Sequence, residues 1–172
     1  RETMTPVRYR GEIVPEWLSG SASAEEFLAH LQARKREYLG YNIIMGNSDA
    51  VWHYNNHSDV PKRLGLGYHG VSNADLNTPW YKVRRGVEKL PQLLPSAVEH
   101  PEVFLELLAD SKLAPDEEVQ VTGLNPAREK LKSALFIRLP DYGTLSSTVV
   151  SFHGSGQVDY CERSYAVDST LF

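Results

Sequence analysis

Two antiparallel hairpin patterns, one on each side of a helical middle, constrain the fold of this chain most strongly. In the first, residues 41–45 and 50–55 are rich in strand-forming side chains and flank the turn residues Gly46-Asn47-Ser48-Asp49. In the second, residues 148–153 and 157–164 flank a Gly-Ser-Gly turn. Because the strands pair within hairpins and the helices lie apart from them in sequence, the pattern indicates an α+β fold and not an alternating βαβ one.

The first helix is predicted from a capping box. Ser23 can accept a hydrogen bond from the backbone three residues on, and Glu26 can return one to the backbone of Ser23. The helix is expected to end at Gly40, because glycine readily adopts the conformation that closes a helix. Its apolar stripe consists of Phe27, Leu28, Leu31 and Tyr38.

A second start signal lies at Thr78-Pro79, because a threonine hydroxyl satisfies a free N–H and proline needs no partner at the first helical position. A short strand, residues 68–71, is predicted to run into Ser72-Asn73, which would leave the Asn73 amide at an exposed strand end, where binding groups tend to lie. The further expected elements are a helix over 79–94 broken near Pro91 and Pro95, a helix over 101–110, a long loop over 111–130 and a strand over 134–139.

Length and composition set the class of protein. The 172 residues are 41% apolar and 23% charged, which fits one globular domain over residues 1–172. The net charge of -4 argues against nucleic acid as a partner, since phosphate binding needs a basic surface. No apolar run approaches the roughly 18 residues needed to span a bilayer, so no transmembrane segment is expected. A single cysteine, Cys161, fits a reducing compartment such as the cytosol or the mitochondrial matrix.

The sequence carries no motif for phosphate, nucleotide or metal binding. His53 and His57 are four residues apart, but His53 falls in a predicted strand, so the helical spacing of a zinc site does not apply. Any scattered histidine, His69 among them, could serve as a single haem ligand, although an ordinary histidine is the simpler reading. Cys161 shares a strand face with Arg163, which could activate its thiol, and a packed small side chain is the alternative.

Polar residues gather at the two ends of the second hairpin. Thr144 precedes one strand and Arg163 ends the other. An arginine suits a carboxylate or propionate, and the Asn73 amide can donate to and accept from a carbonyl group. The structural alternatives are that Asn73 caps a turn and that Arg163 pairs with Asp159 or Glu162.

Several blocks of sequence, met in order along nearly the whole chain, resemble one known family. Gly70-Val71-Ser72-Asn73-Ala74 with Thr78-Pro79-Trp80 and Lys82 is similar to the Gly-Leu-Ser-Asn-Ala … Thr-Pro-Trp-x-Lys segment of the transport and Golgi organisation protein 2 family, also called the NRDE family. The other blocks are Arg10 to Val14, Tyr38 to Ile44, Tyr142-Gly143-Thr144 with Ser147-Thr148-Val149, and Glu162-Arg163-Ser164.

The resemblance implies a four-layer αββα sandwich of the N-terminal nucleophile hydrolase type. It also implies that this chain is the C-terminal two-thirds of the protein, because the family begins with Met-Cys and an Asn-Arg-Asp-Glu motif and this chain begins at Arg1. Part of the domain would then be missing at the N-terminus. Such enzymes use the side chain and the α-amine of residue one, and arginine can supply neither function. Asn73 matches an asparagine that supports the acyl intermediate, whereas Leu145 stands where the family often has arginine.

Two functions follow from the resemblance, and a third from the sequence. The first is a non-catalytic carrier or chaperone in haem or lipid/acyl-CoA trafficking and secretory-pathway organisation, cytoplasmic or associated with mitochondria or the Golgi. Haem would then be a transported ligand, and no metal site is expected. The second is a cysteine-type amidohydrolase acting on a C–N bond, with its nucleophile outside this chain. The third is an interaction module that uses residues 111–130. The expected ligand-binding residues are Asn73, Arg163, Thr144 and His69.

Overall fold

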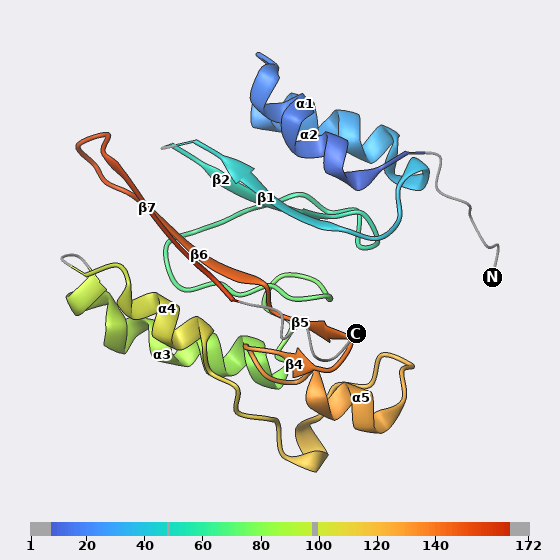
Figure 1. The fold of residues 1–172 in the computed structure, drawn as a ribbon. Coiled ribbons are helices and arrows are strands. Elements are labelled where there is room, and N and C mark those ends of the chain that lie inside the picture. Colours follow the sequence, from blue (N-terminus) through green and yellow to red (C-terminus); the bar gives the residue numbers. More distant parts are fainter. Residues whose placement is uncertain (1–7, 48, 98–99, 166–172) are drawn as a thin grey trace. The chain divides into compact units, whose positions relative to one another are not determined.

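The chain divides into two compact units. The computed structural model describes residues 8–47, 49–97 and 100–165. Unit 1 takes the described residues up to Gly67 together with Val71–Leu76, and unit 2 takes Tyr68–Gly70 and the described residues from Asn77 onwards. Both units combine helices with antiparallel strands, so the α+β class predicted from the sequence is confirmed (Figure 1).

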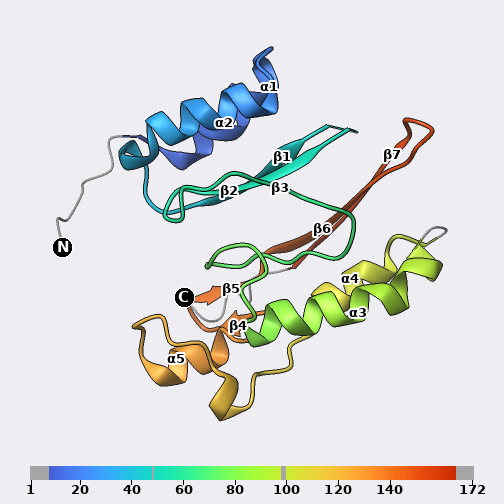
Figure 2. The same cartoon turned by 180° about the vertical axis from the view of Figure 1, so that it is seen from behind.

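Unit 1 is a helical layer on one face of a small sheet, seen from two sides in Figures 1 and 2. The capping box forms as predicted, since Ser23 Oγ accepts from the Glu26 N–H at 3.2 Å and the Glu26 carboxylate accepts from the Ser23 N–H at 2.8 Å. The elements of unit 1 are η1 (Arg10–Glu12), α1 (Ile13–Ser19), α2 (Ala24–Ala33), η2 (Lys35–Glu37), β1 (Asn42–Gly46), β2 (Val51–Asn55) and β3 (Lys62–Arg63).

The core of unit 1 lies between these helices and the sheet. Helix α2 ends at Ala33 and not at Gly40, yet Tyr38 still reaches the core after the short turn η2. Met45 and Tyr54 enter the core from the sheet, and the tilted ring of Trp17 packs on Phe27 with centroids 5.3 Å apart. The buried cluster consists of Ile13, Phe27, Leu28, Leu31, Tyr38, Met45 and Tyr54.

The register of the sheet fixes which side chains turn away from this core. Strands run in the order β1-β2-β3, with Asn42 opposite Asn55 and Ile44 opposite His53. Side chains alternate along a strand, so Asn42, His53 and Asn55 share the face that the helices leave open. His53 is nevertheless completely buried, because residues 71–76 cover this face.

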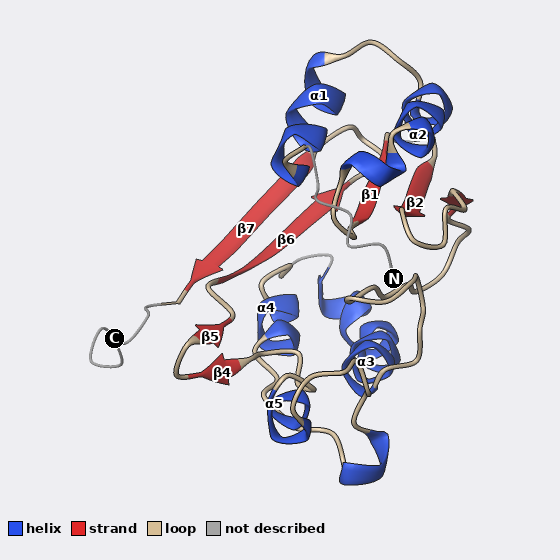
Figure 3. Ribbon diagram, turned by 90° about the vertical axis from the view of Figure 1, so that its right-hand side faces the viewer, coloured by secondary structure: helices blue, strands red, loops and turns tan. Residues whose placement is uncertain are grey.

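Unit 2 contains the longest helix and the clearest hairpin (Figure 3). Its elements are α3 (Tyr81–Ala97), α4 (Val103–Leu108), η3 (Asp116–Glu118), α5 (Pro126–Leu131), β4 (Arg138–Leu139), β5 (Tyr142–Gly143), β6 (Ser146–Phe152) and β7 (Val158–Ser164). Helix α4 packs against α3 on one side and β6 on the other. Ser147 and Val149 of β6 are buried, whereas Val150 and Phe152 are exposed.

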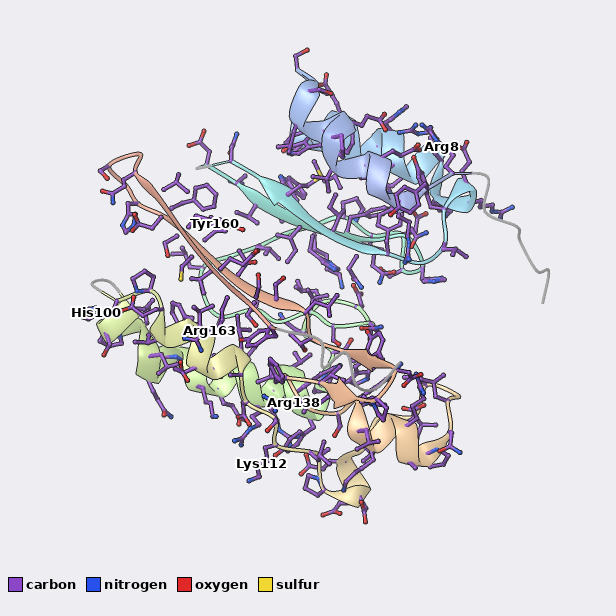
Figure 4. All side chains as sticks on the ribbon, viewed as in Figure 1. Arg8, His100, Lys112, Arg138, Tyr160 and Arg163 are labelled. Carbon is purple, nitrogen blue, oxygen red and sulfur yellow. The ribbon has the colours of Figure 1, made fainter. Side chains whose placement is uncertain are left out.

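Ion pairs connect the elements of unit 2. Asp110, just after α4, accepts from Arg85 and Lys89 of α3, each at 2.6 Å. Arg163 of β7 pairs with Glu106 of α4 at 2.9 Å. Figure 4 shows Arg163 and Tyr160 on opposite sides of the hairpin, as the alternation of a strand requires.

Some predicted elements are wrong. Residues 68–71 form no strand: the Gly70 N–H donates to Asn77 Oδ1 at 2.9 Å and the Asn77 N–H donates to the Gly70 carbonyl at 2.7 Å, so the segment closes a loop in place of joining a sheet. Asn77 has a φ of 58°, in the left-handed region that asparagine tolerates.

The helix predicted over 79–94 begins at Tyr81 and continues through both prolines to Ala97. Pro91 and Pro95 are one helical turn apart and both exposed, so their rings lie on the solvent side, and each removes only one backbone donor.

The loop predicted over 111–130 contains η3 and most of α5. Asn125 caps α5 by accepting from the N–H groups of Ala127 and Arg128, and Pro126 fills the first position. The strand predicted over 134–139 shrinks to Arg138–Leu139, because the Phe136 N–H donates to the Asp110 carbonyl and not to a strand.

Candidate functional site

A pocket of about 490 Å³ opens in unit 1 where α1 begins, where β1 begins and where β2 ends. One wall is apolar, with side chains from α1 and β1, and the rest is polar. A pocket of this size with an apolar wall and a few polar groups is typical of small-molecule binding sites. The lining residues are Arg10, Ile13, Val14, Gly40, Tyr41, Asn42, Ile43, Asn55, His57, Ser72 and Asn73.

Arg10 and His57 form a corner of this pocket around Gly40. Arg10 Nη1 donates to the Gly40 carbonyl oxygen at 2.8 Å, which holds the guanidinium at the pocket wall. The His57 ring lies directly against Gly40, so closely that a Cβ atom on residue 40 would be 2.3 Å from His57 Nε2. Only glycine therefore leaves the imidazole room to stay in this position.

Asn55 and Asn56 hold the polar wall in place through hydrogen bonds to the backbone. Asn55 Oδ1 accepts from the His57 N–H at 2.8 Å and from the Ser58 N–H at 3.2 Å, which fixes the turn that carries His57. Asn56 Oδ1 accepts from the Tyr41 N–H at 2.8 Å. Asn55 and Asn56 are both buried, and a buried amide that satisfies backbone groups is costly to remove.

Asn42 ties residues 71–76 to the sheet. Its Nδ2 donates to the Ser72 carbonyl at 3.1 Å, and its Oδ1 accepts from Asn55 Nδ2 at 3.0 Å. The same Oδ1 lies 2.8 Å from His53 Nε2. Because an amide oxygen can only accept, Nε2 of His53 carries a proton.

The other ring nitrogen of His53, Nδ1, lies near the ion pair between Asp75 and Lys62. His53 Nδ1 lies 3.7 Å from Asp75 Oδ1 without a hydrogen bond, and Asp75 Oδ2 accepts from Lys62 Nζ at 2.6 Å. Burial lowers the pKa of His53, and Lys62 lowers it further, while Asp75 opposes the shift. The hydrogen bond from Lys62 lowers the pKa of Asp75. His53 is therefore a neutral, buried support behind the pocket wall.

Comparison with known proteins identifies the family. A family model described as Transport and Golgi organisation 2 matches residues 1–167. The chain belongs to this family. Its relatives include the transport and Golgi organisation protein 2 homologue of cattle, 32% identical over 171 residues, and that of the mouse, 30% identical over 176 residues. The human homologue is 28% identical over 172 residues. Each match covers 91% of this chain and 62% of the relative, so the chain spans less than two-thirds of their length.

Asn73, predicted from the family resemblance, is exposed and lines the pocket. Its Oδ1 accepts from the Ser72 hydroxyl at 3.4 Å. It lies in the loop formed by residues 70–77 and not at a strand end. The structure thus brings Asn73 into one pocket with Arg10 and His57, which belong to distant parts of the sequence.

The other three predicted residues of this family member belong to unit 2, where each has a partner of its own. His69 Nδ1 lies 3.0 Å from Asn77 Nδ2. Thr144 Oγ1 accepts from the Ile137 N–H at 3.1 Å. Arg163 pairs with Glu106 and not with Asp159 or Glu162. Among the described residues no group of three His, Cys, Asp or Glu side chains is arranged to hold a metal ion.

Sequence reasoning missed the pocket residues Arg10, Asn42, Asn55 and His57 as a group. A weak signal was available, because the predicted hairpin pairs the start of one strand with the end of the other and so sets Asn42 beside Asn55. Nothing local in the sequence brings Arg10 to Gly40, thirty residues away.

No helix in the described part of the chain is long and apolar enough to cross a membrane.

Proposed function

We propose that this chain is the binding part of a non-catalytic carrier for a small amphipathic molecule of the haem or acyl-CoA class, acting in transport and Golgi organisation. The observation that carries the proposal is the unit 1 pocket, in which an apolar wall faces a few fixed polar groups. A carrier needs this combination, because the apolar wall lowers the free energy of the lipid-like part of the ligand while the polar groups orient its head.

The hydrogen bonding of the pocket wall supports a binding role. The buried amides behind the wall make a rigid hydrogen-bonded network, which suits a preformed binding surface. Asn73 is the ligand-binding residue of this proposal, whereas His69, Thr144 and Arg163 stay predictions from the sequence.

The test is a titration of the whole chain with haem and with a fluorescent acyl-CoA. Replacing Asn73 with alanine should weaken binding about fivefold, the value of one neutral hydrogen bond, while the melting temperature stays within about 2 °C of the original. Gln92→Ala is the matched control, because Gln92 is an exposed amide on α3 in unit 2. Binding that does not saturate, or that falls equally in both variants, would contradict the carrier proposal.

The proposal extends to the fold and setting of the longer protein. Residues of the relatives that this chain does not match would add strands to the small sheets of both units and complete an αββα sandwich. The protein would then act in the cytoplasm, in association with mitochondria or the Golgi. A structure of a full-length relative that lacks this sandwich would contradict the first statement, and imaging of the tagged full-length protein tests the second.

A further inference from the structure

We infer that the unit 1 pocket selects molecules with an anionic head, a carboxylate or a phosphate, and that Arg10 is the residue that recognises it. This inference rests on the carrier proposal and adds the chemical class of the ligand. It follows from an imbalance at the polar wall, where four acceptors are bonded within the protein while most N–H groups of Arg10 make no hydrogen bond to the described residues.

Four acceptors of the wall make hydrogen bonds within the protein itself. Asn42 Oδ1 accepts hydrogen bonds from two side chains, and Asn55 Oδ1 accepts them from two backbone N–H groups. The Gly40 carbonyl oxygen accepts from the Arg10 guanidinium, and the Ser72 carbonyl oxygen accepts from the Asn42 amide. No aspartate or glutamate is among the described lining residues. A ligand that offered hydrogen-bond donors would find few acceptors here.

The donors of Arg10 and Asn73, in contrast, remain available. A guanidinium has five N–H groups, and the bond from Arg10 to Gly40 uses one of them. Asn73 Oδ1 accepts from Ser72, which leaves the Nδ2 amino group of Asn73 as its outward donor. The ligand group that fits such a set is an acceptor, and a planar arginine fork matches carboxylate and phosphate oxygens especially well.

The charge of Arg10 is also not neutralised by a neighbouring carboxylate in the described part of the chain. The nearest acidic residue in sequence, Glu12, pairs with Arg8 and accepts from the Tyr38 hydroxyl at 2.9 Å. Glu37 in turn faces Arg8 at 3.8 Å. Both carboxylates are therefore engaged with other groups, and the pocket retains the positive charge that an anion needs.

His57 supports the same corner. Its ring rests on Gly40, and its backbone is fixed by the buried Asn55. The imidazole is exposed and contributes a second nitrogen-bearing group next to the Arg10 guanidinium. We expect His57 to contribute less than Arg10, because an imidazole offers fewer N–H groups than a guanidinium.

The test compares three fluorescent probes that share one polyunsaturated chain: parinaric acid, parinaryl phosphate and parinaryl alcohol. The chain should bind the acid and the phosphate about tenfold more tightly than the alcohol, the value of one charge-assisted hydrogen bond. Arg10→Gln should bring the acid and the phosphate to the affinity of the alcohol and leave alcohol binding unchanged. Preference for only one of the two anionic probes would identify which head group the pocket takes.

Two variants separate recognition from folding. Arg36→Gln makes the same change at an exposed arginine in η2, outside the pocket, and should leave all three affinities unchanged. Arg10→Lys keeps the charge and should retain part of the preference for anions, with a melting curve like that of the original chain. If the alcohol binds as tightly as the acid and Arg10→Gln changes nothing, the anion inference is wrong while the carrier proposal stands. If no probe binds, the inference is wrong and the carrier proposal loses its support with lipid-like ligands.

Discussion

The pocket wall of unit 1 and the contact between α3 and α4 in unit 2 rest on different kinds of polar contact. In unit 1 the buried polar side chains are neutral, and His53, Asn55 and Asn56 make hydrogen bonds to other amides or to the backbone. In unit 2 the contact between α3 and the end of α4 is charged, with Asp110 between Arg85 and Lys89. Neutral hydrogen bonds depend little on salt and acid, whereas ion pairs depend on both.

The difference teaches how the binding surface is stabilised. A pocket that must keep its polar wall fixed is built on amides, which cannot lose or gain charge, and on one contiguous apolar cluster beneath the sheet. Unit 2 has no such amide network among its described residues, and its elements meet through carboxylates and basic side chains. The two units should therefore respond differently to core truncation, to acid and to mild pH change.

The largest expected effect is in the core of unit 1. Leu31 is completely buried, so Leu31→Ala should lower the free energy of unfolding by about 3 kcal/mol, from lost apolar burial and the cavity that remains. Urea unfolding followed by tryptophan fluorescence measures this change. Leu39→Ala, at a residue that is 53% exposed, is the control and should change stability by less than about 1 kcal/mol. Equal losses in the two variants would show that the cluster is not the core of this unit.

The next effect concerns the ion pairs of Asp110 in unit 2. Burial raises the pKa of Asp110, but hydrogen bonds from Lys89, from the Lys112 N–H and from Arg85 outweigh it and lower the pKa from 3.8 to about 2. The native state therefore gains stability above pH 4, about 2 kcal/mol, and loses it as the pH falls towards 2.

Asp110→Asn should remove this gain at pH 7 and leave little difference between variant and original chain near pH 2. Urea midpoints measured across this range provide the comparison. Asp141→Asn, which removes an exposed partner of Arg128, is the control and should have a much smaller effect at every pH. A constant difference between Asp110→Asn and the original chain at all pH values would refute the assigned ion pair.

The smallest effect concerns His53, the buried histidine behind the pocket wall. The pKa of His53 is lowered by burial below its ordinary value of 6.5, so the unfolded chain binds more protons than the native one below that pH. Stability should thus be complete above about pH 6.5 and decline as the pH falls below it.

His53→Gln can still donate to Asn42 but cannot titrate, so its melting temperature should decline less between pH 7 and pH 5. His30→Gln, at an exposed histidine of α2, should decline as the original chain does. If the melting temperatures of the His53 variant and the original chain fall in parallel with pH, the pKa of His53 does not differ between the native and the unfolded state.

The sequence predicted those parts of the fold that depend on near neighbours. Both hairpins and the capping box at Ser23 formed where turn and cap residues indicated them. The strand predicted over 68–71 is wrong because a strand needs a partner, and this segment pairs with Asn77 of its own loop. The helix at Pro126 was missed although Asn125-Pro126 is a recognisable start signal, because a polar composition suggested a loop.

The candidate site was predictable only in part for the same reason. Asn73 was found through its neighbours in sequence, which carry the family resemblance. Arg10, Gly40 and His57 meet only after the chain has folded, and none of the three stands in a local pattern that indicates binding. The prediction that residues 1–172 form a single domain stays a prediction.

Gly40 gives this molecule a position where shape can be changed without changing charge. A methyl group there would collide with the far end of a flexible imidazole and not with backbone, so the ring could swing aside while the fold remains. The variant Gly40→Ala would keep Arg10, His57 and the whole asparagine network in composition and alter only their arrangement. For a geneticist this is a separation-of-function allele: a stable, normally abundant protein in which the loss of one binding corner can be studied in living cells.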